Sequence, residues 1–527
     1  MNTNKYSNLL AFIVIVVASS IGITPQASAE PNLDATSVRQ ERLSATRLAD
    51  ANLTRREGSF MLDYQSIGLP DNQAIDLLGY HILTPVNDWL YLGVGSYAPL
   101  LKGEYGGFMA FGFLAHAQRK IAGNLFANGG VSVGGGGGGK SIEQSVELSG
   151  TGGYAKGYFG LGYEFRNFSA GANISRMKFF KSAIDGTQLN LYVQRPFSYG
   201  TGPYANSGDR FISARPSGSR DTVDGGFESM LSAGLDNYLQ IDPVGSYKGT
   251  INAVDLQFSQ FFTERSYWYY ALGVGYKGLP IYNQVIGGLG SRVSVSPRIN
   301  LYGQLGIGSG GYAPALIDTG SGLLLYPKLS AEYLLNKNLG LALTSGYIFA
   351  PDGTSKNITF GAGLNYRIRS AGTGKGVINS AEGRYEGYRI SFSHETKLNL
   401  KVNGSARENL NMLTVQGDRI INDYVYIPVR ASISYEAYRG YPGYGEISAG
   451  VGLQSKFSEA DRSQIFGELQ AGANVEGSIL RAGIGLNYGL SEDLALRGLV
   501  SQTIGENGFR ATNVELGLTY RFSLPSF

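Results

Sequence analysis

The chain contains no cysteine, which excludes disulfide bonds, a thiol nucleophile and any metal site built on thiolates. Charge is also scarce: 16% of residues are charged, whereas soluble domains average about 25%. The formal net charge of +3 leaves no basic surface of the kind that binds nucleic acid. The only histidines, His81, His116 and His394, are far apart and have no metal-ligand spacing. We therefore expect no cofactor and no nucleic-acid partner.

Long apolar runs are missing except at the start. Leu9 to Ile23 is apolar, and Ala27-Ser28-Ala29 follows as a small-x-small cleavage site. This pattern predicts a signal peptide over residues 1–29. A membrane anchor is the alternative, but a spanning helix needs about 20 apolar residues. No cysteine follows the cleavage site, which excludes lipoprotein processing. The polar segment 30–57 is either a short amphipathic helix or a flexible lead-in.

What the chain does have is glycine, tyrosine and phenylalanine, with 76, 35 and 25 residues, in a pattern of period two that begins at Gly58. Over 514–523, apolar side chains alternate with polar ones, and Glu515 and Arg521 both lie on the polar face. Residues 358–369 repeat this arrangement. A soluble β-sandwich alternates as well. Here, however, the apolar face carries an aromatic residue near the strand end, as in the interfacial girdle of a membrane barrel.

An internal repeat divides the chain. Residues 87–94 (NDWLYLGV) match residues 422–429 (NDYVYIPV), and residues 266–274 (SYWYYALGV) form a looser third copy. These matches predict three β-barrel repeats over 58–197, 227–369 and 386–527. The intervening linkers, 198–226 and 370–385, are rich in glycine and small polar residues and are expected to be irregular.

Each repeat accommodates about eight strands of ten to fourteen residues, which is long enough to cross an outer membrane when tilted. Connections alternate in length. Short turns are expected at 263–266 and 294–297, and longer loops at 135–150 and 310–322. Short turns on one side of the membrane and longer loops on the other are typical of transmembrane barrels.

The C-terminus carries a recognisable motif. Glu515, Gly517, Tyr520 and Phe522 follow the order polar-x-Gly-x-x-aromatic-x-aromatic, and Phe527 ends the chain. This motif resembles the assembly signal of bacterial outer-membrane β-barrel proteins, although that class often stops at the aromatic residue itself. The resemblance implies an outer-membrane location, a periplasmic segment 30–57, and insertion by the barrel-assembly machinery with periplasmic chaperones. It also implies contact with outer-membrane lipids and lipopolysaccharide.

Two closures of the sheet are open. One is a single all-β, antiparallel transmembrane barrel of about 24 strands, and the other is three tandem barrels of about eight strands. Irregular linkers and a partial internal copy of the assembly signal at Gly363, Tyr366 and Ile368 favour three barrels. Small inward residues such as Gly361 and Gly171 favour one wide ring, because a narrow interior must be filled. We expect the single large barrel and keep the three small barrels as the alternative.

Two features invite a chemical interpretation. Gly134 to Gly139, with Lys140 and Ser141, satisfies the phosphate-loop pattern letter for letter. It lacks the strand-loop-helix context of that motif, so an outer loop is expected instead. His116 has no serine two residues away on its strand face, so no Ser-His-acid triad and no enzyme activity are expected.

Five arginines are expected to face the lumen: Arg367, Arg369, Arg430, Arg497 and Arg521. They indicate either a polar lumen that favours anions or internal ion pairs with Glu515, Glu468 or Asp255. The first interpretation predicts a channel or an export conduit, for a surface polymer such as a polysaccharide, with periplasmic export partners and the longer loops as gates. The alternative is a structural or adhesive surface protein of three narrow barrels. A lipid-modifying enzyme is the third hypothesis.

Overall fold

The computed structural model describes residues 54–138, 148–214, 228–280, 282–313, 315–336, 338–368, 380–457 and 462–526. The expected signal peptide, residues 30–53, Arg369, Phe527 and the Gly139-Lys140-Ser141 end of the glycine run lie outside these ranges. Within them, no helix has the length and apolar character needed to cross a membrane.

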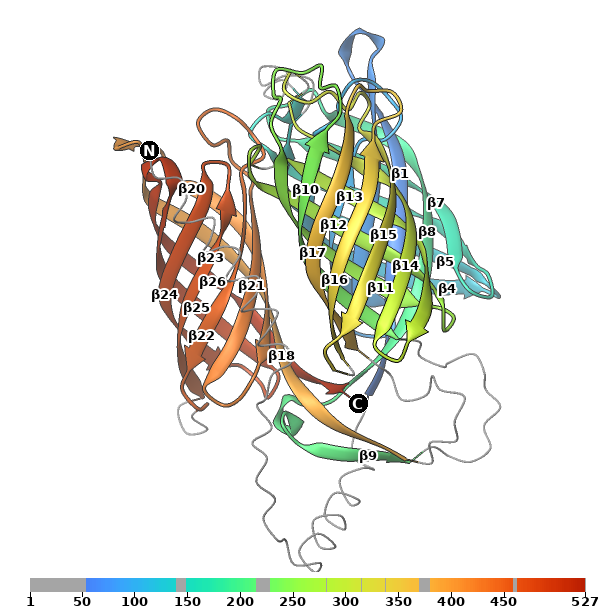
Figure 1. The fold of residues 1–527 in the computed structure, drawn as a ribbon, viewed down its shortest axis with the longest axis vertical. Helices are drawn as coiled ribbons and strands as arrows, with labels where there is room; N and C mark the ends of the chain where they lie inside the picture. The colour runs from blue at the N-terminus through green and yellow to red at the C-terminus, as the bar shows by residue number, and fades with distance from the viewer. Residues whose placement is uncertain are drawn as a thin grey trace, which may run out of the picture.

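The described chain folds into three antiparallel barrels, which Figure 1 shows side by side. Barrel 1 consists of β1 (Thr54–Gly68), β2 (Ala74–Pro85), β3 (Leu90–Ala98), β4 (Met109–Ala122), β5 (Leu125–Gly137), β6 (Gly153–Glu164), β7 (Ser169–Phe179) and β8 (Asp185–Thr201). Barrel 2 consists of β10 (Ser229–Gln240), β11 (Ile251–Phe261), β12 (Ser266–Lys277), β13 (Asn283–Ser296), β14 (Ile299–Gly311), β15 (Leu323–Leu334), β16 (Leu339–Phe349) and β17 (Lys356–Ile368).

Barrel 3 has the same strand number. It consists of β18 (Ser380–Val402), β20 (Leu410–Ile420), β21 (Val425–Ser434), β22 (Gly445–Gln454), β23 (Ser463–Asn474), β24 (Gly477–Gly489), β25 (Leu494–Gly505) and β26 (Arg510–Ser526). A two-residue strand, β19 (Ser405–Ala406), pairs with the end of β18. Three single-turn 3₁₀ helices complete the described elements: η1 (Pro70–Asn72), η2 (Tyr204–Asn206) and η3 (Glu506–Gly508).

Each barrel closes on itself. Strand β1 pairs with β8, with Tyr64 opposite Leu191. Likewise β10 pairs with β17, and β18 pairs with β26, with Ser393 opposite Gly517. The prediction of one ring of about 24 strands is therefore wrong, and the alternative of three eight-stranded barrels is confirmed. When a repeat closes on itself, the backbone N–H and C=O groups of its first and last strands pair with each other, so no sheet edge is left open. Large inward polar side chains fill the narrow interiors, which small residues alone would leave empty.

The alternation predicted for the last strand is confirmed. Leu516 is 60% exposed on the outer face of β26, whereas its neighbour Glu515 is 2% exposed in the interior. In β17, Phe360 is 49% exposed and Arg367 is 1% exposed. On the outer face of both strands, charge is thus confined to the end residues Lys356 and Arg510, and the middle is apolar, as a hydrocarbon environment requires. Closed barrels with apolar exteriors confirm the class-level resemblance to outer-membrane β-barrel proteins.

The two ends of the barrels differ. At one end, named the turn end, four-residue turns are capped by a side chain, as where Asn87 Oδ1 accepts hydrogen bonds from the backbone N–H groups of Trp89 and Leu90 at 3.0 and 2.9 Å. Asn422 caps the equivalent turn of barrel 3, and Thr263 caps that of barrel 2. In barrel 2, the residue that corresponds to Asn87 is therefore Thr263. It is not Ser266, where the looser sequence copy begins. The opposite end, named the loop end, carries most of the longer connections.

Part of each expected linker is ordered. Strand β9 (Arg210–Ala214) pairs with the first residues of β18, where Ser380 lies opposite Ala214. The expectation of irregular chain is wrong for residues 198–201, 210–214 and 380–385, which lie in β8, β9 and β18. Strand β18 extends beyond barrel 3 at the turn end (Figure 1), and β9 covers the edge that this extension would expose.

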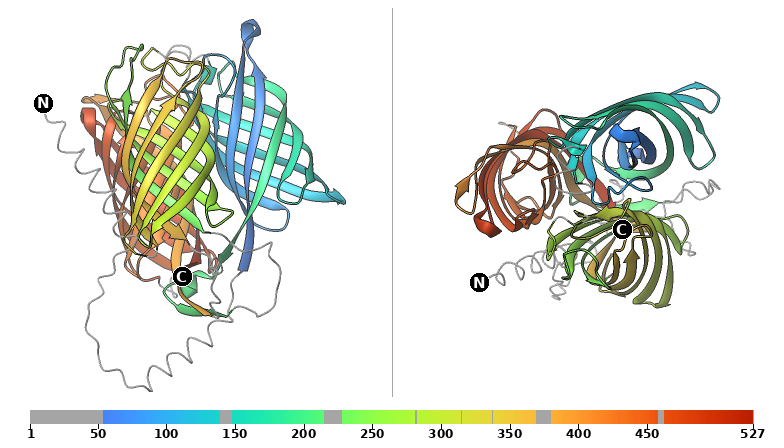
Figure 2. Two further views of the ribbon diagram at one scale, coloured as in Figure 1. Left: turned by 45° about the vertical axis from the view of Figure 1, so that its right-hand side comes forward. Right: turned by 90° about the horizontal axis from the view of Figure 1, so that it is seen from above.

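The three barrels stand in a triangle when viewed along their length (Figure 2). Aromatic rings join barrels 1 and 2, where Phe60 lies 5.1 Å from Trp268 and Tyr80 lies 5.6 Å from Tyr270, measured between ring centroids. Barrels 1 and 3 meet where Phe113 lies 5.3 Å from Phe392. The outward faces away from these seams keep large exposed apolar side chains.

Candidate functional sites: three filled lumens and a locked loop end

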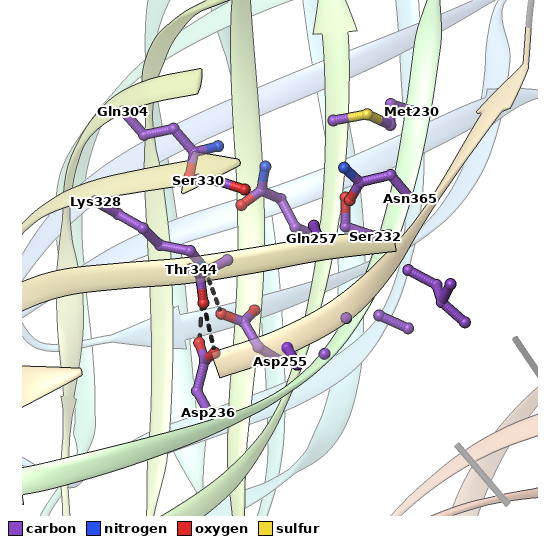
Figure 3. A pocket seen from close by; sticks show the side chains of 16 residues that line it. Met230, Ser232, Asp236, Asp255, Gln257, Gln304, Lys328, Ser330, Thr344 and Asn365 are labelled. Carbon is purple, nitrogen blue, oxygen red and sulfur yellow. Dashed lines mark hydrogen bonds and ion pairs between the residues drawn. The ribbon is translucent and has the colours of Figure 1, made fainter. Parts of the chain in front are cut away.

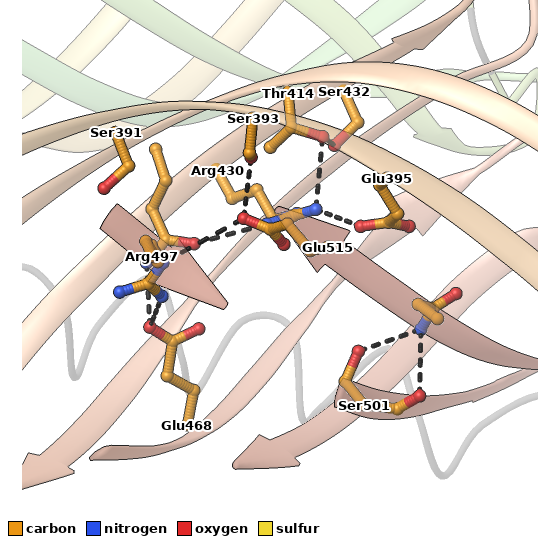
Figure 4. A network of polar contacts seen from close by, with 12 residues as sticks. Ser391, Ser393, Glu395, Thr414, Arg430, Ser432, Glu468, Arg497, Ser501 and Glu515 are labelled. Atoms are coloured by element: carbon orange, nitrogen blue, oxygen red, sulfur yellow. Dashed lines mark hydrogen bonds and ion pairs between the residues drawn. The ribbon is translucent and has the colours of Figure 1, made fainter. Parts of the chain in front are cut away.

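A buried network of ions occupies the interior of barrel 3 (Figure 4). Arg430 on β21 contacts Glu515 at 2.7 Å and also pairs with Glu395. Arg481 on β24 lies 2.7 Å from Glu395 and 3.3 Å from Glu515. Each carboxylate is thus held by two guanidinium groups, and all four side chains are at most 3% exposed. The planar guanidinium, with five donors, suits such bridging.

Further ion pairs extend this network along the lumen. Lys397 binds Glu395 at 2.8 Å and Glu446 at 2.9 Å. Arg497 pairs with Glu468, whose carboxylate also accepts hydrogen bonds from Tyr426 and Gln416 at 2.7 and 2.8 Å. Nearer the turn end, Arg389 pairs with Asp418 at 2.9 Å. The inward placement of Arg430 and Arg497 follows the predicted register, and their partners are Glu395, Glu515 and Glu468. Both arginines form ion pairs inside barrel 3, and their side chains fill its lumen.

In barrel 2, Arg367 lies in a similar cluster at the turn end. Its guanidinium pairs with Glu332 and lies 3.0 Å from Glu228, which Arg292 also contacts at 2.7 Å. Tyr302 donates a hydrogen bond of 2.7 Å to Glu332. The expected partner Asp255 binds Lys328 at 3.2 Å instead of an arginine.

The interior of barrel 1 holds fewer ions and more aromatic rings. Asp63 pairs with Lys156 and accepts a hydrogen bond of 2.8 Å from His81 Nε2. The ammonium of Lys156 lies 4.8 Å from the ring centroid of Tyr97, close enough for a cation–π contact. Asp63 thus serves as the acceptor that allows two buried basic groups to lie in this lumen.

The other two histidines lie against tyrosine and glutamine side chains. His116 Nδ1 lies 2.6 Å from the Tyr158 hydroxyl, and its Nε2 lies 3.1 Å from Gln194. His394 lies on the outer face of β18, 2.7 Å from the Tyr435 hydroxyl. Within the described ranges, the hydrogen-bond partners of these histidines and of His81 include no serine. In the same ranges, no cluster of three or more His, Asp or Glu side chains is arranged to hold a metal ion.

Arg521 lies at the mouth of barrel 3, where a segment from another part of the chain covers the opening. Its guanidinium lies 5.2 Å from the ring of Tyr204 and donates a hydrogen bond of 2.8 Å to the Glu492 carbonyl oxygen. Tyr204 belongs to η2, between barrels 1 and 2, and packs in one apolar cluster with Tyr426 and Phe466. Burial raises the pKa of the Tyr204 phenol. The connection after barrel 1 thus closes the turn end of barrel 3.

The assembly-signal residues have structural partners in β26. Glu515 belongs to the ion network, and a Cβ added at Gly517 would overlap the carbonyl oxygen of Phe392. Tyr520 and Phe522 lie with ring centroids 5.8 Å apart at the turn end. The Tyr520 hydroxyl accepts a hydrogen bond of 3.3 Å from Arg56 of barrel 1. An assembly role for this motif stays a prediction.

The glycine run that mimics a phosphate loop is a contact between barrels. Gly134–Gly137 form the end of β5, not a free loop. A Cβ at Gly135 would overlap the carbonyl oxygen of Ser434 in barrel 3, and one at Gly137 would lie 2.9 Å from Pro442. Glycine is needed here because the backbone of β5 approaches the β21–β22 connection so closely. We name this contact the glycine seam, formed by Gly135 and Gly137 with Ser434 and Pro442.

A second contact locks the loop ends of barrels 1 and 2. The backbone N–H of Gly106 donates a hydrogen bond of 2.9 Å to the Gly320 carbonyl oxygen. Ser321 donates one of 2.8 Å to the Leu100 carbonyl oxygen. Described residues of both expected gates, 135–150 and 310–322, therefore take part in contacts between barrels, namely Gly135, Gly137, Gly320 and Ser321.

Sequence reasoning missed several network members, among them Glu395, Lys397 and Arg481. Their signal was present, because Ser391, Ser393, Glu395 and Lys397 alternate with outward residues along β18. Extending the period-two register to that strand would have placed them inside.

No family model matches this chain, and no curated protein matches it. Among solved structures, the siderophore receptor PirA from Pseudomonas aeruginosa is 11% identical, with 90% of this chain and 81% of that chain covered and a TM-score of 0.25. A mutant of the ferric enterobactin receptor PfeA from the same organism is 10% identical over the same shares, with a TM-score of 0.27. A de novo designed transmembrane β-barrel is 14% identical over 26% of this chain and 94% of its own, with a TM-score of 0.19. These likenesses carry no argument about substrate or partner.

Proposed function

We propose that this chain is an outer-membrane surface scaffold, in which three narrow barrels hold their loops together as one rigid platform. The observation that carries this proposal is the combination of filled lumens and locked loops. Buried ion pairs such as Arg430–Glu515 occupy barrel 3, while Gly106–Gly320 and the glycine seam join the loop ends. Eight-stranded barrels are just wide enough for side chains to fill, so a polymer has no path through any single barrel.

Location and orientation form part of the proposal. Apolar outward faces suit a bilayer, and longer loops at one end suit the outside of the cell. The platform would then face the surroundings, with lipopolysaccharide beside it. The chain would act through what its loops bind or support.

The orientation can be tested with epitope insertions on intact cells. An epitope after Lys248, in the loop-end connection between β10 and β11, should bind antibody without permeabilisation. An epitope after Glu264, in the turn between β11 and β12 of the same barrel, should bind only after permeabilisation. The reverse pattern would overturn the orientation, and two buried epitopes would overturn the surface location.

Planar bilayers test the scaffold against a conduit. The purified chain should give no large, stable conductance step and no flux of a neutral polysaccharide. Steps of the size given by wide porins would contradict filled lumens.

A second candidate function is a narrow ion pathway, and one observation favours it. Barrel 2 contains a cavity of about 50 Å³ whose lining includes the polar side chains of Ser232, Ser330 and Asn365. If ions pass there, Ser330→Leu should abolish a small conductance, because the larger side chain fills the cavity. Leu329→Phe, on the outward face of the same strand, should leave it unchanged.

A further inference from the structure

Two facing carboxylates lie in the cavity of barrel 2 (Figure 3). Asp236 on β10 and Asp255 on β11 both line it, at 3% and 5% exposure. Lys328 Nζ from β15 lies 3.2 Å from Asp255 and 3.6 Å from Asp236. Thr344 donates a hydrogen bond of 3.2 Å to the other oxygen of Asp236. The cluster therefore joins three strands of the barrel and one hydroxyl from β16.

When both carboxyl groups are ionised, this cluster contains two negative charges, on Asp236 and Asp255, and one positive charge, on Lys328. The remaining ions of the lumen, Arg367 and Arg292 with Glu332 and Glu228, balance one another at the turn end. An uncompensated charge in a buried site is strongly unfavourable. Either a proton shared by the two carboxyl groups or a bound cation would supply the one further positive charge.

Two buried oxygen atoms point to where that charge lies. Asp255 Oδ1 accepts no hydrogen bond from the protein, and Asp236 Oδ2 faces only Lys328 Nζ, at 3.6 Å, although both oxygen atoms are out of contact with solvent. Around them, the lining of the cavity of about 50 Å³ includes the hydroxyls of Ser232 and Ser330 and the side-chain amides of Gln257 and Asn365, together with apolar side chains such as Met230. At about 10–15 Å³ for each water, it has room for a small ion with a few waters.

We propose that this cavity binds one monovalent inorganic cation of the sodium class between Asp236 and Asp255. Hard cations prefer carboxylate, hydroxyl, amide and water oxygens, and the first three of these groups line the cavity. A single excess negative charge matches a monovalent ion, because a divalent ion would leave the site positive. The inference does not depend on the scaffold function, since a bound ion would complete the interior of barrel 2 in either case.

The experiment measures the unfolding of the full chain in lipid vesicles, with sodium chloride replaced stepwise by choline chloride at constant ionic strength and pH. Above the dissociation constant, each tenfold rise in sodium should shift the unfolding equilibrium about tenfold toward the folded state. Asp255→Asn removes the excess charge and should abolish this dependence. The control Asp185→Asn, in the exposed hairpin between β7 and β8, removes a carboxylate elsewhere and should keep it.

A wild-type protein whose unfolding does not respond to sodium would overturn the proposal. So would a response to pH alone, which would mean that the two carboxylates share a proton. If Asp255→Asn does not fold, crystals of the wild type in thallium(I) salts decide the question. An anomalous peak between Asp236 and Asp255 would support the site, and an empty cavity would refute it.

Discussion

Individual arginines decide how the lumen of barrel 3 is filled. Arg430 is 2% exposed and, like Arg481, contacts both Glu395 and Glu515. A buried pair of this kind adds little net stability compared with a well-packed apolar pair, but removing one member leaves an uncompensated charge. Removing one of these arginines should therefore lower the free energy of unfolding, even if the intact ion pair adds little to it.

Replacing Arg430 with methionine tests this directly. Arg430→Met should lower the free energy of unfolding by about 3–5 kcal/mol, because Glu395 and Glu515 lose a partner that water cannot replace. Urea titration of the chain refolded into lipid vesicles measures the change.

Arg439→Met is the matched control. Arg439 pairs with Glu476 at 3.0 Å, but its side chain is 44% exposed at the loop end, and exposed pairs contribute about 0–1 kcal/mol. Equal losses in the two variants would show that the lumen of barrel 3 is hydrated and that its ion pairs are screened.

Residue placement was largely predictable. Period-two alternation assigned Arg367, Arg430, Arg497 and Arg521 to the interior because a one-residue shift would have put them in lipid. Alternation could not identify which carboxylate each arginine meets, because partners come from strands far apart in sequence. Arg481 and Glu395, for example, lie 86 residues apart.

Among the elements, β5 shows how a strand can serve two barrels at once. Its alternating inward residues line barrel 1, while Gly135 and Gly137 bring its backbone against barrel 3. The absence of a side chain is the feature that creates this contact.

Gly135→Val should separate the loop ends of barrels 1 and 3 without unfolding either barrel, since the added side chain overlaps Ser434. Trypsin should then cleave after Arg439, in the adjoining β21–β22 connection, at least several-fold faster than in the wild type. Gly157→Val provides the control, because a Cβ at Gly157 in β6 meets nothing within 4 Å. Unchanged cleavage in Gly135→Val would mean that the glycine seam does not hold the connection in place.

Closure was the element-level feature that the sequence could not decide. One wide ring and three narrow barrels contain the same strands, the same turns and nearly the same neighbours. They differ only in which strand meets β1, β10 and β18, and local alternation has no influence on that choice. The partial copy of the assembly signal at Gly363 and Tyr366 was the better guide, because each barrel that closes needs its own final strand.

At the scale of the whole molecule, three barrels that each satisfy their own backbone still pack against one another. The seam between barrels 1 and 2 contains Phe60, Trp268, Tyr80 and Tyr270, with a polar contact of 3.1 Å between Ser96 and the Tyr270 hydroxyl. Such aromatic contacts contribute about 0.5–1.5 kcal/mol beyond the area that they bury.

Tryptophan quenching by brominated lipids can follow this seam. In a Trp89→Phe background, Trp268 is the sole reporter, and barrel 1 should shield it. Phe60→Ala should increase its quenching, because lipid chains would enter the gap. Phe159→Ala, on the exposed face of the same barrel at 68% exposure, should leave quenching unchanged. Equal quenching in all three proteins would indicate that the barrels stand apart in the membrane.

The contact between the connection after barrel 1 and the end of the chain has a consequence for biogenesis. Gly202 and Ser523 exchange two backbone hydrogen bonds of 2.9 Å, so the final strand of barrel 3 fastens onto a segment made more than three hundred residues earlier. A prematurely terminated product would lack this clasp, and the mouth of barrel 3 would stay uncovered. Proteases would then reach the interior of barrel 3 in chains truncated before Ser523 more readily than in chains that contain the clasp.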